Sequence, residues 1–431
     1  MRILIISQEL WTTKNNGGNV LSNLFEGFDA EFAQIYCSPG MPENNVCKNY
    51  YQITDMMMIK HFFRKEKIGL KKTFVEYPKH NLQNIENSSN ENSFYSFFKR
   101  HHWLIFDILR EVLWKFSNWN SKDLELFIKE FNPDVVFAPC YGSHYMLSMT
   151  RYIAGKTDAK IISYISDDHY SFRQFRLSPL YWLYRFSLRQ SLKKTFRKYS
   201  LTYTMTEEQK QELTNALGAN MKILRKGGDN KEIIDKNSVG KPIRLIYAGN
   251  LCCGRMETLS HISEVLKEIN KTNVEIELNV YTNSIITDDI KTKLNDNKSS
   301  FLYAAVSQDT LKQLYNKSDI MLHVEAFSLK YKLLTRLSFS TKIVDCLASG
   351  CAVLCISWNG HSGYKYLRDE DAAICIDNLE NVKSILVNLI NNKEIILEYR
   401  QKALNCLKKN HNIQYIRQDL FNDFKKFSKN N

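Results

Sequence analysis

The C-terminal half of the chain alternates short apolar runs with segments of helical length, and this alternation constrains its fold more than any other feature. The apolar runs are RLIYAG, VEIELNVY, FLYAAV, DIMLHV, CAVLCI and AAICI. Between them lie amphipathic stretches such as ETLSHISEVLKEIN, whose apolar residues recur at three- and four-residue intervals. Strands that alternate with helices form parallel sheets covered on both faces. The residues from about 241 to 405 are therefore predicted to form one doubly wound α/β domain.

The N-terminal half repeats this pattern less regularly. Its strand candidates are MRILIIS, FAQIYC, DVVFAP, KIISYIS, LTYTM and MKILR, and GGNVLSNLFEGF reads as a helix after a glycine-bearing loop. An irregular insertion at about 40–120 interrupts the series. The predicted fold class is α/β, with two Rossmann-like doubly wound domains that face each other across a cleft.

The boundary between the two domains is predicted in the polar stretch DNKEIIDKNSVGKP, which has no apolar period. We expect an N-terminal domain over 1–235 and a C-terminal domain over 236–431, with the last helix packing back on the N-terminal domain. Ligands of open α/β sheets bind at the carboxyl ends of the strands, so chemistry is expected in the loops there.

Composition narrows the class of protein without choosing a partner. Lysine plus arginine total 59 and aspartate plus glutamate 46, which gives a net charge of +13. Such an excess favours nucleic acid, anionic lipid or phosphorylated small molecules. The ten cysteines contain no C-x-x-C pair, which argues against a zinc site, and no metal is predicted. Unpaired cysteines, the lack of a signal-peptide pattern and the lack of a long apolar run predict a cytoplasmic protein.

The first loop of the C-terminal domain, in YAGNLCCGR, has the residues of a phosphate site. Gly249, Asn250 and Gly254 allow the backbone to approach a ligand, and Arg255 offers a planar fork that fits phosphate. The alternative is a helix start with an exposed arginine. Glu325, which follows the DIMLHV run, could accept hydrogen bonds from a ribose diol or could be a solvated loop residue.

A second candidate site lies in FSTKIVDCLASGCAVLC. Ser340 or Thr341 is expected to cap a helix, and Lys342 lies in its first turn, where a cation is unfavourable beside the helix dipole. An anion in front of the lysine would remove this conflict, and the site would have the size of a diphosphate. The alternative is a capped surface helix with a solvated lysine.

These segments together resemble GT-B fold glycosyltransferases, and the resemblance is closest to the family-four-like enzymes that build bacterial capsule, O-antigen and other surface polysaccharides. YAGNLCCGR resembles the first loop of their C-terminal domain. DIMLHVEAF followed by STKIVDCLASGCAVL resembles their donor segment, with its S-K-x-x-E/D-x-x-A-x-G pattern. KNNGGNV, with Gly17 and Gly18, resembles their glycine-rich loop on the acceptor side. The resemblance covers most of the chain apart from the insertion.

The resemblance implies transfer of a sugar from a UDP- or GDP-sugar to a glycan or lipid-linked hydroxyl acceptor, with no other cofactor. It assigns the donor diphosphate to Asn250, Arg255, Ser340, Thr341 and Lys342, and the donor sugar or ribose to Glu325 and Asp345. Many retaining members carry two glutamates eight positions apart, but Leu337 stands eight positions before Asp345. Retention or inversion of configuration therefore stays open.

An inverting enzyme would need a general base on the N-terminal domain. Asp167, Asp168 and His169 follow the KIISYIS run and are the catalytic candidates, with His144 as a weaker one. Neighbouring carboxylates and a histidine can adjust one another's pKa values. The alternatives are an Asp-Asp pair that starts a helix, or a chance match to the metal-binding D-x-D motif of another glycosyltransferase fold.

Two basic, aromatic segments remain, at 97–119 and 172–200. Both could lie against an anionic membrane at the inner face of the cell, or could be core helices with a solvated basic face. No nucleic-acid recognition motif is present, so no nucleic-acid partner is predicted. The remaining alternatives are a sugar-nucleotide epimerase of the same fold and a non-catalytic nucleotide-sugar or nucleic-acid binding protein. A dehydrogenase is disfavoured, because no G-x-G-x-x-G follows a first strand.

Overall fold

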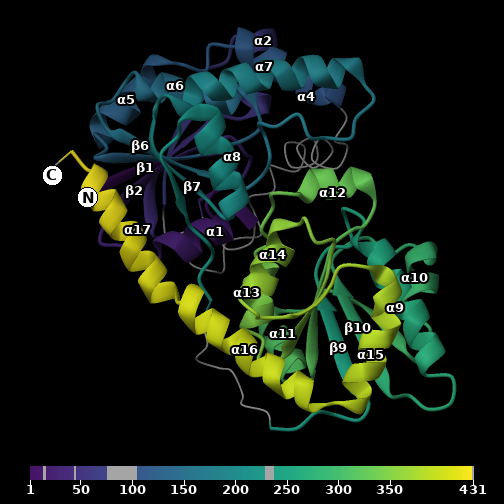
Figure 1. Ribbon diagram of the computed structural model, residues 1–431. Helices are drawn as coiled ribbons and strands as arrows, with labels where there is room; N and C mark the ends of the chain where they lie inside the picture. Colours follow the sequence, from purple (N-terminus) through teal and green to yellow (C-terminus); the bar gives the residue numbers. More distant parts are fainter. Residues whose placement is uncertain (13–15, 43–44, 75–103, 229–236, 430–431) are drawn as a thin grey trace, which may run out of the picture.

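Two parallel sheets, one in each half of the chain, organise the computed structural model (Figure 1). The structure describes residues 1–12, 16–42, 45–74, 104–228 and 237–429. Residues 235 and 236, between which the domain boundary is predicted, are not among the described residues, and this boundary stays a prediction.

The N-terminal sheet has eight strands in the order β4-β3-β2-β1-β5-β6-β7-β8. All neighbours are parallel except β3 and β4, which pair antiparallel. Its strands are β1 (Arg2–Ser7), β2 (Glu31–Tyr36), β3 (Cys47–Gln52), β4 (Leu70–Thr73), β5 (Val135–Pro139), β6 (Lys160–Ile165), β7 (Tyr199–Thr204) and β8 (Met221–Ile223). Its helices are α1 (Asn16–Phe25), α2 (Asp55–Arg64), α4 (Leu104–Phe116), α5 (Lys122–Phe131), α6 (His144–Ala154), α7 (Pro179–Phe196) and α8 (Glu207–Leu217).

The C-terminal sheet has six parallel strands in the order β11-β10-β9-β12-β13-β14. Its strands are β9 (Ile243–Ala248), β10 (Ile276–Thr282), β11 (Ser300–Ala304), β12 (Ile320–Val324), β13 (Ala352–Ile356) and β14 (Ile374–Ile376). Its helices are α9 (Arg255–Ile269), α10 (Asp288–Leu294), α11 (Gln308–Asn316), α12 (Leu329–Thr335), α13 (Lys342–Leu347), α14 (Ser362–Asp369), α15 (Val382–Asn391) after the 3-10 turn η2 (Leu379–Asn381), and α16 (Glu394–Asn410). The alternation of strand and helix read from the sequence is confirmed.

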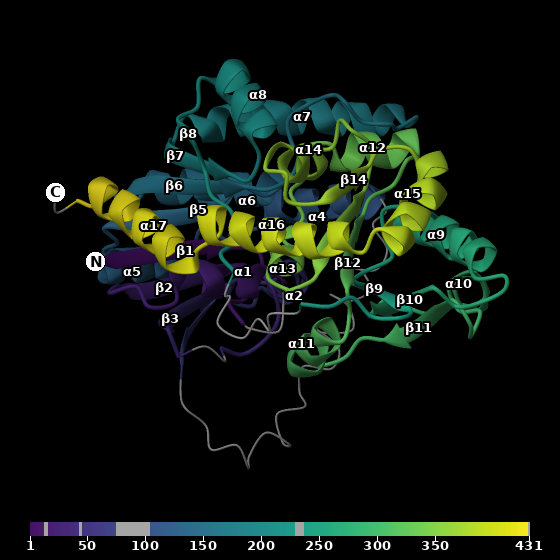
Figure 2. The same ribbon diagram turned by 60° about the horizontal axis from the view of Figure 1, so that its bottom comes forward.

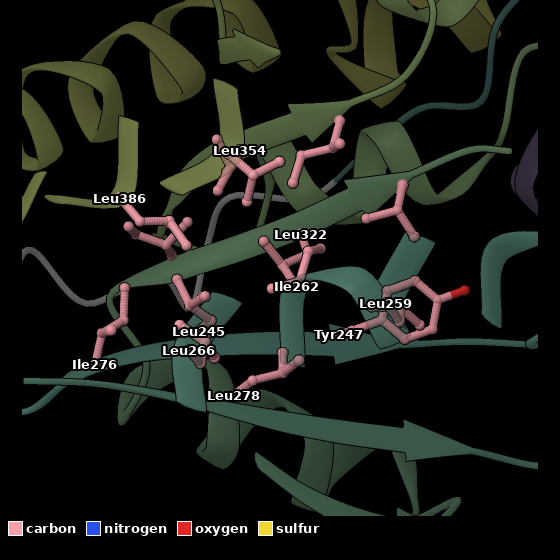
Figure 3. Packing of buried hydrophobic residues seen from close by; sticks show 14 of the residues in the cluster. Leu245, Tyr247, Leu259, Ile262, Leu266, Ile276, Leu278, Leu322, Leu354 and Leu386 are labelled. Carbon is pink, nitrogen blue, oxygen red and sulfur yellow. The ribbon is translucent and has the colours of Figure 1, made fainter. Parts of the chain in front are cut away.

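The core of the C-terminal domain forms where α9 and α15 cover one face of this sheet (Figure 3). Leu245, Leu278 and Leu322 project from three neighbouring strands, and Leu259 and Leu266 from α9 pack against them. The helical spacing of the α9 residues puts them on one face, which buries the apolar side chains and stabilises the domain.

The chain returns to the N-terminal domain through its last two helices. α16 packs against the C-terminal domain. α17 (Ile413–Phe427), which comes next, lies along the N-terminal domain (Figures 1 and 2). Phe424 of α17 is fully buried and packs on Phe25 of α1 and Phe137 of β5 at centroid distances of 5.5 and 5.9 Å. The last helix thus belongs to the N-terminal domain in space.

The segment predicted as an irregular insertion differs from that expectation. β3 and β4 join the sheet, and α2 and α4 cover it. The strand CKNYYQ escaped the sequence reading because Lys48 and Asn49 interrupt its apolar character. β3 lies near the edge of the sheet, where such polar side chains are tolerated.

The predicted hydroxyl cap of the helix after Phe339 is also wrong. α13 has only six residues, its N-cap Thr341 has helical dihedrals (φ −58°, ψ −20°), and no side chain caps it. A capping hydroxyl needs an extended backbone at the N-cap. The chain already turns at Ser340, whose carbonyl accepts the N–H of Ile343 at 2.9 Å.

Candidate functional site

The strand order of the C-terminal sheet gives a topological switch point between β9 and β12, where a ligand-binding crevice is expected. The chain leaves β9 toward β10 on one side and reaches β12 on the other, so the connections diverge at this point. Open α/β sheets bind ligands at such a topological switch point, outside the carboxyl ends of the strands. The loop at 249–254 and the loop that begins at Glu325 border this crevice.

Lys342, the first residue of α13, reaches over the end of β9. Its Nζ donates to the hydroxyl of Tyr247 at 3.3 Å and lies 4.8 Å from the centroid of the Tyr247 ring. A Cβ on Gly249 would lie 1.5 Å from this Nζ. A residue without a side chain is therefore required at position 249 for the lysine to take this path.

The ammonium group of Lys342 carries an uncompensated charge. Within the described parts of the chain no carboxylate lies at ion-pair distance from it, and its hydrogen bond is to a neutral phenol. Burial, and then the charge of Arg255, lower the pKa of Lys342 to about 8. Two neighbouring cations at the end of one strand, one of them without a carboxylate partner among the residues that the structure describes, favour a bound anion.

Arg255, the first residue of α9, is held by Glu325. Its Nη2 donates to Glu325 Oε1 at 2.8 Å, and Thr258 Oγ1 donates to the Glu325 carbonyl at 2.8 Å. The Glu325 side chain is 1% exposed. Burial raises the pKa of this carboxyl, but neighbouring groups, the Arg255 guanidinium among them, outweigh this effect and hold the pKa below its usual value. Glu325 is therefore charged and orients the guanidinium.

Two buried histidines complete the floor of the crevice. Burial lowers the pKa of both, to about 3 for His323, so both imidazoles are neutral. Nδ1 of His361 accepts the N–H of Tyr364 at 3.3 Å, which places the ring proton on Nε2. His323 Nε2 lies 3.9 Å from Glu325 Oε1 and has no hydrogen-bond partner, and Glu325 Oε2 has none either.

The structure places the other donor-site candidates as follows. Asn250 has an exposed side chain, and its carbonyl accepts a hydrogen bond from Tyr247 at 2.6 Å. Ser340 and Thr341 are half-buried and immediately precede Lys342. Asp345 forms an ion pair with Lys226 at 2.6 Å, in the segment that leaves β8. The contacts of Arg255 and Lys342 described above do not include Asp345.

Asp168, one of the three catalytic candidates, is a junction between the two domains. Its carboxylate accepts the N–H groups of Tyr170 and Ser171 at 3.2 and 2.8 Å, and it also accepts the Ser171 hydroxyl. It pairs with Arg185 of α7 at 3.3 Å and with Arg336, at the end of α12, at 3.4 Å. The side chain is 4% exposed, so its lone pairs are engaged inside the protein.

Asp167 and His169 are freer. Asp167 is exposed, and its Oδ1 accepts the Ser338 hydroxyl at 3.4 Å, four residues before Lys342 in the donor segment. The His169 ring lies against Gly142, where a Cβ would be 2.6 Å from its Nδ1. Burial lowers the pKa of His169, with the Asp167 charge opposing this effect, and the ring is neutral. Both residues line a cavity of about 510 Å³ bordered by α8, together with Arg173, Arg189 and Glu212.

The N-terminal sheet has its own switch point, between β1 and β5. Gly17 and Gly18 lie in the first turn of α1, which follows β1. His144 begins α6, which follows β5, and its N–H is accepted by Glu111 at 2.7 Å. Burial raises the pKa of Glu111 to about 7, with the N–H groups of His144 and Tyr145 opposing this effect.

Sequence reasoning did not single out Tyr247, His323, His361, Arg336 or Glu111. One signal was available, because His323 stands two residues before Glu325 and so faces the same side of β12. The partners of the others come from distant segments. No group of three or more His, Cys, Asp or Glu side chains among the described residues is arranged to hold a metal ion.

Part of the chain that forms this site matches a known family. Residues 263–422 match the profile of a family described as glycosyl transferase-like. The match includes β12, α13 and β13, and therefore Glu325 and Lys342. No curated protein matches the chain in sequence.

Several solved structures share the fold over nearly the whole chain. An E. coli trehalose-6-phosphate structure bound with UDP-2-fluoro glucose is 11% identical at a TM-score of 0.62, over 99% of both chains. An α,α-trehalose-phosphate synthase (UDP-forming) from Burkholderia xenovorans, in complex with glucose-6-phosphate, is 9% identical at 0.62, over 98% of this chain and 100% of that one. A sucrose-phosphate synthase from Thermosynechococcus elongatus is 7% identical at a TM-score of 0.61, over 99% of this chain and 98% of that one. The two-domain fold predicted from the sequence is thus confirmed.

The junction at Asp168 yields a prediction about stability. Asp168→Ala would leave the buried Arg185 guanidinium without its carboxylate and would remove one of the two carboxylates that the half-buried Arg336 contacts, and we expect unfolding to become about 3–5 kcal/mol easier. The matched control is Asp167→Ala, at an exposed neighbour, for which a change within about 0.5 kcal/mol is expected. Urea unfolding of the three proteins measures both values. Equal effects of the two substitutions would contradict the structural role of Asp168.

Proposed function

We propose that this chain, a glycosyltransferase of the GT-B fold, transfers a sugar from a nucleotide-diphosphate sugar to a hydroxyl of a glycan or lipid-linked acceptor in bacterial surface polysaccharide or glycolipid synthesis. The observation that carries the proposal is that two cations, Arg255 and Lys342, lie together at the switch point of the C-terminal domain. Most of this domain matches the glycosyl transferase-like family. The UDP sugar analogue in a structure of the same fold supports a nucleotide-sugar donor, such as a UDP- or GDP-sugar.

The charge of the leaving group explains why two cations are needed. As the bond from the anomeric carbon to the diphosphate breaks, negative charge grows on the phosphate oxygens. Glu325 fixes the Arg255 guanidinium. Tyr247 holds the Lys342 ammonium, which passes close over the backbone of Gly249, so both cations are in position before the reaction. Preorganised charges avoid the cost of reorientation when the charge develops. Asn250, Ser340 and Thr341 would supply further polar contacts to the diphosphate.

The acceptor hydroxyl must lose a proton as it attacks. If configuration is inverted, we assign the general base to Asp167 or His169, because the Asp168 carboxylate is already engaged by two arginines. Asp167 touches the donor segment through Ser338, which brings the base near the donor side of the domain seam. The ribose and sugar contacts of Glu325 and Asp345 stay part of the proposal, and in the free protein these residues hold Arg255 and Lys226.

A sugar-nucleotide epimerase is the alternative with the same fold, because it would use the same diphosphate contacts. An epimerase would act on one sugar and would need no surface for an acceptor. The N-terminal domain, however, exposes many large apolar side chains. We define the apolar face as exposed residues of α2, α4 and α7 and the loop before α7: Phe62, Phe63, Ile105, Leu109, Val112, Phe116, Leu177, Leu180, Leu183 and Phe186.

The apolar face favours a peripheral membrane contact at the cytoplasmic side. On α4, Ile105, Leu109, Val112 and Phe116 follow helical spacing, so they form one stripe, and Phe116 is 75% exposed. α7 contacts α4 through the hydrogen bond from Tyr184 to Glu111, and Figure 1 places α2, α4 and α7 at the same end of the molecule. Arginines in the loop before α7 add positive charge, which suits anionic lipid. No described helix has the length and apolar character of a membrane span.

Turnover provides the direct test. Incubation with a panel of nucleotide sugars and candidate acceptors should release a nucleoside diphosphate, and Lys342→Ala should lower that rate about 10²–10³-fold. The matched control is Lys317→Ala, at an exposed lysine at the end of α11. Conversion of a donor into its sugar epimer would favour the epimerase, and an unchanged rate in Lys342→Ala would refute the diphosphate assignment.

The pKa of Lys342 predicts how nucleotide affinity depends on pH. The ammonium is protonated below its pKa of about 8 and attracts the diphosphate, so the affinity for UDP or GDP should fall as pH rises through about 8. Titration calorimetry between about pH 7.5 and 9.5 avoids the phosphate's own ionisation near 6. The series is measured in Cys252→Ser, because a neighbouring thiolate would add a second repulsion. Adding Lys342→Met should flatten the profile, and a persistent slope would assign the titration to another group.

Membrane contact is tested with vesicles. Binding to vesicles with phosphatidylglycerol should exceed binding to pure phosphatidylcholine and weaken with salt. The double variant Leu109→Glu/Phe116→Glu should reduce binding at least about tenfold, because two apolar anchors are lost. Ile285→Glu, at a residue of the C-terminal domain that is 75% exposed, is the control. Equal binding of both variants would remove the apolar face from the proposal.

A further inference from the structure

Cys252 differs from the other cysteines of the chain. It lies in the loop between β9 and α9, and in the part of the chain that the structure describes it is the one cysteine classed as exposed. Cys253 and Cys375 are half-buried, and the remaining seven are buried. Reagents in solution therefore reach the Cys252 sulfur most directly.

The surroundings of Cys252 favour its thiolate. Arg255 Nη1 lies 3.9 Å from the Cys252 sulfur, and the N-terminus of the 15-residue helix α9 follows the loop. A hydrogen bond from Cys253, and then the charges of Arg255 and Lys342, lower the pKa of the Cys252 thiol to about 6, against the opposing effect of burial. The pKa of Cys253 is raised, so Cys253 keeps its proton as the donor. Low thiol pKa, exposure and a thiol neighbour are together the features of reactive cysteines.

The thiolate uses the same cations as the proposed donor. Arg255 and Lys342 are the groups that we assign to the diphosphate, and in the free protein Nη1 of Arg255 lies 3.9 Å from the Cys252 sulfur while its Nη2 pairs with Glu325. A diphosphate in the crevice would bring negative charge beside the sulfur and would shield it. The nucleotide-sugar donor and a reagent that modifies the Cys252 sulfur are therefore expected to compete for the space beside Arg255 and Lys342.

We propose that Cys252 is a modification site at which a mixed disulfide with a small thiol such as glutathione blocks the binding of the nucleotide-sugar donor. The thiolate attacks one sulfur of glutathione disulfide, a new S–S bond forms, and the other half leaves as glutathione thiolate. Excess free thiol reverses the reaction. The adduct places a tripeptide with negative charges in the crevice, where it excludes the diphosphate. The blocking role rests on the proposed function, whereas the reactivity of Cys252 rests on the loop alone.

The linkage between the two events is reciprocal. If the adduct lowers donor affinity, bound nucleotide must lower the extent of modification by the same factor at equilibrium. The protein would then be sensitive to oxidised thiols mainly when its donor is scarce.

The test treats the full-length protein with glutathione disulfide, with and without UDP or GDP, and follows the adduct by intact mass and peptide mapping. We expect one adduct, on Cys252, slowed at least tenfold by the nucleotide that binds, and at least a tenfold loss of nucleotide affinity that dithiothreitol restores. Cys252→Ser should take up no adduct and keep the same affinity before and after treatment, and Cys375→Ser should behave like the unaltered protein. An adduct spread over other cysteines, or one on Cys252 that leaves affinity unchanged, would overturn the inference.

A second measurement separates this inference from the proposed function. The rate of alkylation of Cys252 by iodoacetamide needs no nucleotide, and it should exceed that of Cys375 and fall in Arg255→Ala. If Cys252 reacts no faster than Cys375, the inference is wrong whatever the protein binds. If Cys252 is reactive but the unmodified protein binds no nucleoside diphosphate, the proposed function fails and the blocking role fails with it.

Discussion

The contact of Asp168 with Arg185 and Arg336 joins the two domains beside the segment that leads to the candidate site. Asp168 belongs to the loop after β6, whereas Arg336 ends α12 in the other domain. Arg336 also donates to Glu212 of α8 at 2.9 Å, and Thr206 donates to the Leu337 carbonyl at 3.2 Å. Removing one partner from such a network leaves buried charge behind, so the network holds as a unit. The segment that leads to Lys342 is thereby attached to the N-terminal domain.

The crevice brings two cations together, of which, in the described ranges, only one has a carboxylate partner. Glu325 neutralises and orients Arg255, while Lys342 faces a phenol and no carboxylate among the described residues. The imidazoles of His323 and His361 are neutral and add no charge of either sign. A binding site that keeps a cation unpaired in the free protein loses stability but gains affinity for an anion, as is usual where function and stability compete. The thiol of Cys252 lies beside the same two cations.

Much of the fold could be predicted from patterns that act locally. The runs RLIYAG, DIMLHV and CAVLCI became β9, β12 and β13, because buried parallel strands are apolar on both faces. β3, which lies next to the edge strand β4, was missed because Lys48 and Asn49 leave it without such a run. The short helix α13 was expected with a hydroxyl cap, but the backbone conformation at Thr341 depends on how the preceding segment packs against the other domain. Gly249, Arg255, Glu325 and Lys342 were singled out from the sequence, and their role in a donor site stays a prediction, whereas the contacts with Tyr247 and the two histidines required the folded sheet.

The sequence by itself determined the alternation of strands and helices, the α/β class and the residue types at the ends of the strands, because these depend on neighbours a few positions apart. Only the tertiary structure decided which end of a strand meets which helix. It joined Lys342 to Tyr247 of β9, 95 positions earlier, paired Asp345 with Lys226, and engaged Asp168 with arginines from both domains. Those outcomes follow from packing and charge burial between distant segments, and hydrophobic periodicity carries no information about them.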